Sequence, residues 1–302
     1  MLARLQQLTV LGLLFGSLAW AVYFVSVGRW GWALAGPIAV AAVYAGALGV
    51  EFFWLRRSYP PGSEEQPGAV ELLRAWLAET TIAPVVFLWR QPFRSRAIAD
   101  AAAEPAPGRR GVVLVHGFFC NRGLWNPWMQ RFRALDIPYV AVSLEPVFGS
   151  IDGYVDRLEA AVAQVERATG LAPVLVAHSM GGLAVRAWLA RRGGPERFHH
   201  AVTVASPHHG TWMARHARTT NGRQMRPDSP WLAALEATEA AELYARFTCF
   251  WSRCDNIVFP TTRATLPGAE NRHLAGTPHV RMAYHPEVFE TVLRLVRAAG
   301  SS

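Results

Sequence analysis

One serine of this chain lies in a setting that can turn its hydroxyl group into a nucleophile. Ser179 follows an apolar run at 173–178, with Ala177 two residues before it and Gly181 two residues after it. A sharp turn from a strand into a helix lifts a serine Oγ above a sheet, and small neighbours allow the strained backbone. N–H groups at the start of that helix also point at an anion. The pattern predicts a nucleophile at Ser179; a serine that only caps a helix is the alternative.

A second segment, Val113–Phe119, can help to stabilise a developing negative charge. It is a Val-rich run that ends in His116-Gly117-Phe118-Phe119. An oxyanion needs two preorganised donors, and this loop can supply one while the N–H of Met180 supplies the other. Together the two segments resemble the α/β-hydrolase superfamily, in particular its bacterial lipases and esterases, with Ala177 in place of the first Gly of Gly-x-Ser-x-Gly. The resemblance covers roughly residues 110–300.

The resemblance implies the remaining residues of a catalytic site. In that family the residue after His-Gly supplies an oxyanion-hole N–H, which here is Phe118, and Met180 matches the position after the nucleophile. The family carries its acid in the turn beyond a strand, here Asp255, and its base in a Gly-x-x-His segment before the closing helix, here His279. In such a triad His279 takes the proton of Ser179, and Asp255 holds the imidazole tautomer and stabilises its charged form.

Other histidines and acids are weaker candidates for these roles. His285 precedes Pro286 and suits the start of a helix, and His273 lies within a probable strand. Asp228 comes before the strand at 247–251, in a polar loop, and is expected to be a surface residue. Of these, His285 is the main alternative base.

Strand-like and helix-like segments alternate through the second part of the chain. Short apolar runs predict strands at 111–116, 138–144, 173–178, 201–206 and 247–251. Apolar residues at helical spacing predict helices at 151–168, 181–192 and 286–298. Alternation of this kind predicts an α/β fold with a mostly parallel sheet covered by helices. The predicted catalytic domain is 110–302.

The first fifty residues contain two long uncharged stretches. Residues 5–28 and 30–50 carry no charge, and only Arg29 separates them. About 20 apolar residues span a bilayer as a helix, so we expect a hairpin over 1–57 with spans at about 8–28 and 30–50. A cleaved signal peptide is the alternative, since Ala19-Trp20-Ala21 has the form of a cleavage site. The apolar run continues past that tripeptide, and a second span follows at once.

Basic residues on the flanks of the hairpin indicate its orientation. Arg4, Arg56 and Arg57 flank the two spans, whereas only Arg29 lies in the turn. The positive-inside rule then places both ends in the cytoplasm. We therefore expect an integral protein of a bacterial inner membrane with a cytoplasmic catalytic domain.

Two further segments connect or cover the predicted domains. Residues 58–109 form a linker and juxtamembrane segment, with turn-rich stretches at 58–68 and 101–108. Helical spacing over 70–77 predicts an element packed on the following domain. The alternative is a juxtamembrane surface that touches anionic lipid, since Arg90, Arg94 and Arg96 follow. The insertion at 212–246, rich in Trp, Met and Leu, predicts a small cap over the site; ordinary connecting helices explain it equally well.

Composition excludes several other classes. All 30 basic residues are Arg, the net charge is +8, and no basic cluster exceeds two residues, so a nucleic acid is a poor candidate for a partner. Three cysteines are too few for a disulfide scaffold, and no His/Cys spacing predicts a metal site. We expect neither a metal nor a cofactor.

The sequence therefore predicts a membrane-anchored serine hydrolase that cleaves carboxylic esters through an acyl-Ser intermediate, and we expect those esters to be lipid-like. Its expected partners are that substrate and the bilayer. An acyltransferase with the same triad is one alternative. A membrane transport or assembly protein with an inert hydrolase-like domain is another, and the presence of Ser179, Asp255 and His279 argues against it.

Overall fold

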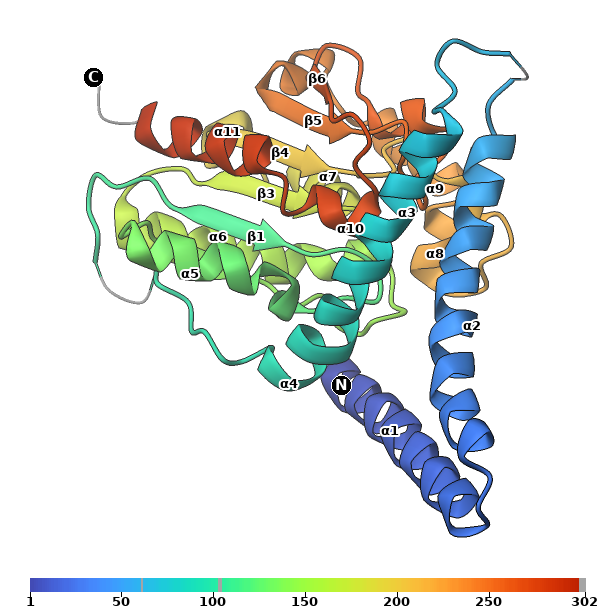
Figure 1. Ribbon diagram of the computed structural model, residues 1–302. Helices are drawn as coiled ribbons and strands as arrows, with labels where there is room; N and C mark the ends of the chain where they lie inside the picture. Colours follow the sequence, from blue (N-terminus) through green and yellow to red (C-terminus); the bar gives the residue numbers. More distant parts are fainter. Residues whose placement is uncertain (61, 103–104, 299–302) are drawn as a thin grey trace.

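A computed structural model describes residues 1–60, 62–102 and 105–298 of the chain (Figure 1). The remaining positions are 61, 103, 104 and 299–302. The first three fall in the two turn-rich stretches predicted at 58–68 and 101–108, and the last four end the predicted catalytic domain. These positions lie outside the described residues.

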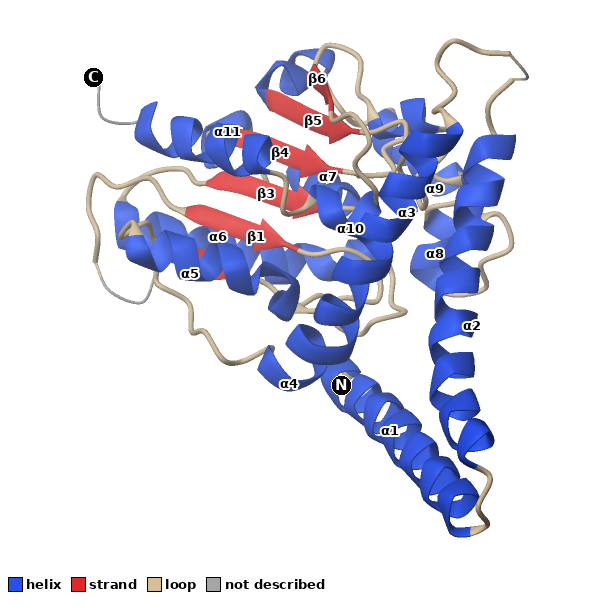
Figure 2. Ribbon diagram, in the orientation of Figure 1, coloured by secondary structure: helices blue, strands red, loops and turns tan. Residues whose placement is uncertain are grey.

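Six parallel strands form one sheet in the order β2-β1-β3-β4-β5-β6 (Figure 2). Their bounds are β1 Val112–Val115, β2 Tyr139–Ala141, β3 Val174–His178, β4 His200–Val204, β5 Phe247–Trp251 and β6 Glu270–His273. The central strands β1, β3 and β4 are mostly apolar, as expected where helices cover both faces of a sheet. The predicted parallel sheet is confirmed. The edge strand β6, which has the polar sequence Glu-Asn-Arg-His, contains His273, the histidine expected in a strand.

Helices pack on both faces of the sheet and create two cores. On one face α5 (Asn126–Ala134) and α11 (Pro286–Arg297) cover Val112 and Leu114 of β1. On the other face α6 (Val155–Thr169) and α7 (Met180–Arg191) cover the alternate residues of β1. This alternation is the two-residue period of a strand, so each face of the sheet has its own apolar surface.

Short helical segments connect these elements. Those that follow β1 to β4 are η2 Arg122–Trp125, η3 Ile151–Tyr154, η4 Pro195–Arg197, η5 Trp212–Ala214, α8 Thr220–Gln224, α9 Pro230–Glu236 and η6 Ala241–Arg246. Those that follow β5 and β6 are η7 Thr261–Ala264 and α10 His279–Met282.

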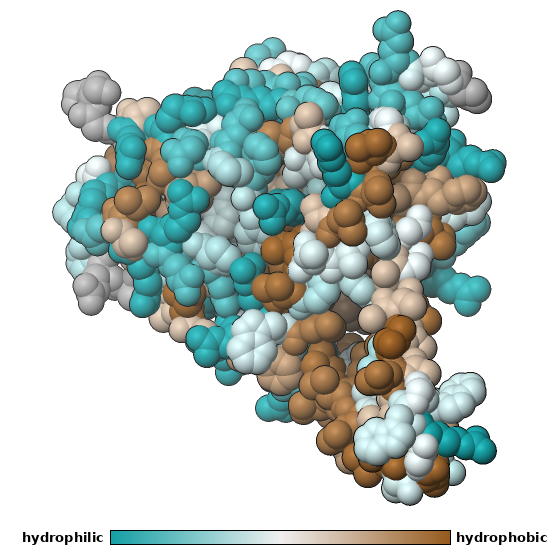
Figure 3. All heavy atoms as spheres, in the orientation of Figure 1, coloured by the Kyte–Doolittle hydropathy of each residue, from teal (hydrophilic) through white to brown (hydrophobic). Residues whose placement is uncertain are grey.

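Three helices precede the sheet. α1 (Leu2–Ser26) and α2 (Trp30–Arg57) form a hairpin, and α3 (Ala69–Pro84) continues through a π-helical segment, η1 (Val85–Arg90), into α4 (Gln91–Arg94). Within the described residues, the three helices at 2–26, 30–57 and 69–94 are long and apolar enough to cross a membrane. Figure 3 shows hydrophobic residues gathered over the α1–α2 hairpin, whereas the surface of the sheet domain is mostly hydrophilic.

Both ends of the hairpin contact the rest of the protein, and its turn points away (Figure 1). At the start of α1, Gln6 Nε2 donates to Gln91 Oε1 over 3.1 Å. At the end of α2, the rings of Trp54 and Trp212 lie 5.0 Å apart. Just beyond α2, the Tyr59 hydroxyl donates to the carbonyl oxygen of Arg253 over 2.9 Å. The hairpin is therefore joined to the sheet domain at the same end at which its two helices diverge.

A buried ion pair ties the 212–246 insertion to α7. The Arg186 guanidinium contacts the Glu239 carboxylate at 2.5 Å, and each side chain is only 1% exposed. Arg186 also donates to the His208 carbonyl oxygen over 2.8 Å. A buried charge that loses its partner is costly, so this pair holds the insertion only while both charges are present.

We expect Arg186→Met to destabilise the protein, because it leaves the Glu239 carboxylate buried without its cation. Breaking a buried pair in this way costs about 3–5 kcal/mol, which corresponds to a fall in melting temperature of roughly 10 °C. Thermal unfolding of the detergent-solubilised full chain measures the effect. Arg192→Met is the matched control, since Arg192 and Asp156 form an exposed pair at 3.2 Å. Equal melting temperatures for the two variants would contradict the expectation.

Candidate active site

Ser179 occupies the turn between β3 and α7. Its backbone has φ 54° and ψ −131°, a conformation that few non-glycine residues adopt. The turn is held on both sides, since the Ser179 N–H donates to the Val204 carbonyl oxygen over 2.8 Å and its own carbonyl oxygen accepts from the Gly182 N–H over 3.0 Å. A Cβ on Gly181 would lie 2.7 Å from the His116 carbonyl oxygen. A larger residue than glycine at position 181 would therefore clash with the backbone at the end of β1.

The loop after β1 passes directly against the serine. A Cβ on Gly117 would lie 2.7 Å from the Ser179 Cβ, so only glycine fits there. Among the described residues, neither the Phe118 N–H nor the Met180 N–H donates a hydrogen bond to a backbone or side-chain acceptor. Two unengaged N–H groups on either side of Ser179 are what stabilisation of an oxyanion requires.

A neutral histidine supports this loop. His116 Nε2 accepts from the Leu144 N–H over 2.9 Å, so the proton of the ring is on Nδ1, which lies 2.9 Å from the Gly117 carbonyl oxygen. Burial lowers the pKa of His116 to about 4. The ring therefore stays neutral and keeps both hydrogen bonds at neutral pH.

Asp255 and His279 form a hydrogen-bonded pair. His279 Nδ1 donates to Asp255 Oδ1 over 2.9 Å, and the same oxygen accepts from the N–H groups of Ile257 and Val258, each at 2.9 Å. Both side chains are buried. Because Nδ1 carries the proton, Nε2 of the neutral imidazole is left free to accept one. A carboxylate in this position fixes the tautomer and stabilises a positive charge on the ring.

The pKa of His279 lies above its usual range. Burial opposes protonation of the imidazole, but the charge of Asp255 and its hydrogen bond, followed by the charges of Glu79 and Glu51, outweigh it. The imidazole of His279 is thus a stronger base than it would be if burial were the only influence on its pKa.

The serine and the imidazole line one cavity. It has a volume of about 410 Å³, and Phe118 and Asn256 also border it. A second cavity of about 270 Å³ meets the first at Phe118, Ser179 and Ile257. Among the described residues, no hydrogen bond joins Ser179 Oγ to His279; such bonds are often long before substrate binds.

The family model of the α/β-hydrolase family matches residues 112–297. The chain belongs to the α/β-hydrolase family. It is similar in fold to the mature form of the Bacillus licheniformis lipase BlEst2, at 16% identity and a TM-score of 0.55, over 64% of this chain and 94% of that one. Aspergillus fumigatus lipase B is similar at 17% identity and a TM-score of 0.52, over 60% of this chain and 51% of that one. No curated protein matches the sequence.

Within this α/β-hydrolase fold, the alternative residues lie apart from the cavity. His285 is partly exposed, and its Nδ1 accepts from the Glu287 N–H at the start of α11. His273 is exposed on β6. The Asp228 side chain is 89% exposed. None of the three lines the cavity of Ser179.

Three residues that the sequence analysis did not single out also border the cavity: Glu51 of α2, Glu79 of α3 and Asn256 beside Asp255. One signal was present in the sequence, since Glu51 is the only acidic residue among the first sixty. It comes directly after the uncharged stretch at 30–50, and an ionisable residue at an apolar span indicates a functional position.

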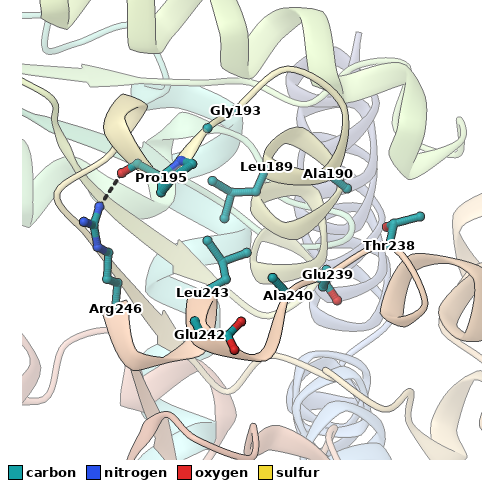
Figure 4. A pocket seen from close by; sticks show the side chains of 11 residues that line it. Leu189, Ala190, Gly193, Pro195, Thr238, Glu239, Ala240, Glu242, Leu243 and Arg246 are labelled. Carbon is teal, nitrogen blue, oxygen red and sulfur yellow. Dashed lines mark hydrogen bonds between the residues drawn. The ribbon is translucent and has the colours of Figure 1, made fainter.

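Another cavity lies away from these residues. It has a volume of about 410 Å³ and lies between the end of α7, η4 and η6, with Leu189, Leu243 and Arg246 in its wall (Figure 4). It contains none of the candidate catalytic residues. Within the described parts of the chain, no group of three His, Cys, Asp or Glu side chains is arranged to hold a metal ion.

The raised pKa of His279 predicts a pH dependence for Ser179. A protonated imidazole cannot accept the serine proton, so labelling of Ser179 by a fluorophosphonate should slow as the pH falls. The midpoint should lie above 6.5, the usual pKa of histidine. Labelling rates across the pH range, with His279→Ala as the comparison, measure it. A midpoint below 6.5, or a rate independent of pH, would contradict the prediction.

Proposed function

We propose that this chain is a membrane-anchored serine hydrolase that cleaves carboxylic esters, with lipid-like esters as its substrates. The observation that carries the proposal is the strained Ser179 turn beside the Asp255–His279 pair, at the wall of an apolar cavity.

The residues have separate roles in the proposed reaction. His279 Nε2 takes the proton of Ser179 as Oγ attacks the ester carbonyl carbon, and the carbonyl oxygen becomes an oxyanion held by the N–H groups of Phe118 and Met180. The bond to the alcohol then breaks, and the departing oxygen takes the proton from His279. Water, activated by the same imidazole, hydrolyses the acyl-Ser intermediate and restores the serine.

The cavities favour an apolar substrate. Leu48, Phe87 and Leu124 line the larger cavity, and Met213 and Met225 line the smaller one. Side chains of this kind bind acyl chains by burying apolar surface. Two structures similar in fold, those of the Bacillus licheniformis and Aspergillus fumigatus proteins, are lipases. Because residues between 211 and 225 form the wall of the smaller cavity, the insertion at 212–246 acts as a cap in this proposal.

The hairpin at 1–57 serves as the anchor. Its two helices have apolar windows of which only 6% is buried, so most of their surface is available to lipid. The segment at 58–109 connects it to a catalytic domain at 110–302. At one end of the hairpin the Met1 amino group donates to Glu145, and at the other end the ring of Trp54 packs against Trp212. Because both ends contact that domain, we place it on the same side of the membrane as Arg4, Arg56 and Arg57. The positive-inside rule makes that side the cytoplasm.

An acyltransferase would use the same residues, with an alcohol in place of water. An assay that adds an alcohol and analyses the products distinguishes the two reactions, since free acid indicates hydrolysis and a new ester indicates transfer.

Ser179→Ala should abolish hydrolysis of p-nitrophenyl esters, because loss of a triad residue costs about 10⁴- to 10⁶-fold in turnover. His279→Ala should be comparably severe, since the residues act as a unit. His285→Ala, at a histidine outside the cavity, is the matched control and should retain most activity. The wild-type enzyme should prefer longer acyl chains over acetate.

Two results would count against the proposal. Ser179→Ala with more than roughly a tenth of the wild-type activity would remove Ser179 as the nucleophile. Loss of activity in His285→Ala but not in His279→Ala would move the base to His285.

Alkaline phosphatase fusions test the orientation. We expect fusions after Arg57 and after Ser302 to be inactive in a bacterial host, because this phosphatase needs disulfides that form outside the cytoplasm. A fusion within the turn, after Gly28, should be active and is the positive control. Strong activity from either of the first two fusions would show an exported domain.

A further inference from the structure

We propose that α2 and α3 supply positioning residues for the active site, namely Glu79 and Glu51, which hold the segment that carries His279. The inference rests on the proposed function of Ser179 and His279 and extends it to residues outside the span that matches the family, 112–297.

Glu79 binds the backbone directly after the imidazole residue. Its Oε1 accepts from the Val280 N–H over 2.8 Å, and its Oε2 accepts from the Arg281 N–H over 3.2 Å. The side chain is 1% exposed, so water does not compete for these hydrogen bonds. A buried carboxylate is costly unless its oxygens are hydrogen-bonded, and here both are. The contact fixes α10 against α3.

Glu51 acts through Asn256. The Asn256 Nδ2 donates to Glu51 Oε2 over 2.6 Å, and the Asn256 Oδ1 accepts from the His279 N–H over 3.2 Å. The amide therefore links α2 to the backbone of the histidine itself. Asn256 also follows Asp255 in the chain, so one buried turn connects Glu51 to both members of the pair.

A third carboxylate binds the other end of the same segment. Glu71 Oε1 accepts from the Gly276 N–H over 3.1 Å. Two glutamates of α3, Glu71 and Glu79, thus bind the backbone N–H groups of 276, 280 and 281 directly. Glu51 of α2 holds the N–H group of 279 through Asn256. A loop held at both ends keeps its histidine in one place, and a displacement of about 1 Å can cost a hundredfold in rate.

The arrangement also sets the charge around the imidazole. The titratable groups that face His279 come from five parts of the fold: Asp255 after β5, Glu79 on α3, Glu51 and Tyr44 on α2, His178 on β3 and Cys120 after β1. His178 donates from Nε2 to the His279 carbonyl oxygen over 3.1 Å, and its burial lowers its pKa to about 3, so it stays neutral. Burial raises the pKa of Glu79 to about 7, so this carboxyl is partly ionised near neutral pH. Asp255, together with Glu79 in its ionised form, stabilises the positive charge that His279 acquires during the reaction.

The experiment compares Glu79→Gln and Glu51→Gln in the full chain in detergent, with a soluble short-chain ester. Glutamine keeps the shape and an acceptor oxygen but removes the charge. In each variant the acid limb of kcat/KM should move to lower pH, by about one unit in Glu79→Gln, because an anion that favours the protonated imidazole is lost. The kcat of Glu79→Gln should also fall about tenfold or more.

Glu65→Gln is the matched control, since Glu65 is an exposed glutamate of the segment between α2 and α3. Its acid limb should match that of the wild type. An acid limb that stays in place in both test variants overturns the proposal, whatever the loss in rate. Glu51→Gln decides the test if Glu79→Gln does not fold, because Glu51 is only half-buried. A wild type that neither hydrolyses the ester nor reacts with a fluorophosphonate would instead refute the proposed function.

Discussion

The hydrogen bond between Asp255 and His279 is the interaction on which the arrangement of the site depends. Removed from water, a carboxylate and an imidazole attract each other strongly, but the cost of burying the carboxylate has to be offset by further hydrogen bonds. Backbone N–H groups of 257 and 258 supply two such bonds to Oδ1. The turn after β5 therefore has to fold tightly around Asp255, and the sheet has to bring that turn to the end of β3, where Ser179 lies.

The sheet meets this requirement because all six strands are parallel. Their carboxyl ends face the same edge, so the loops after β1, β3 and β5 converge there without long excursions. The unfavourable φ of Ser179 persists because neighbouring backbone groups of β4 and α7 hold it. The strain at Ser179 is thus supported by the central strands of the sheet.

Sequence patterns predicted this framework well where the signal was local. The strand at 247–251 and the helix that follows Ser179 were correct to within a residue, because an apolar run and a helical period each reflect one element. The helix α5 was not predicted, although Trp128, Met129 and Phe132 share its buried face. His279, expected in the segment before the closing helix, is the first residue of the short helix α10. A helix of four residues is too short to show a helical period in the sequence.

The contribution of α2 and α3 could not be predicted in the same way. Glu51 and His279 are separated by most of the chain, and only the folded structure joins them through Asn256. The helical period over 70–77 predicted only an element packed on the following domain. It could not predict that Glu79 and Phe87, farther along the same segment, line a cavity. Contacts of this range depend on how the apolar hairpin and the α/β fold pack together, which neither pattern encodes.

The wall that α2 contributes to the cavity changes what substrate concentration means for such an enzyme. Tyr44 and Leu48 lie on a helix whose outer surface is apolar, so a lipid beside that helix is already next to the site. For an enzyme anchored in this way, the relevant quantity is the mole fraction of ester within the membrane or micelle rather than moles per litre of solution. Adding inert detergent would then slow the reaction by dilution at the surface, even with the total amount of ester unchanged.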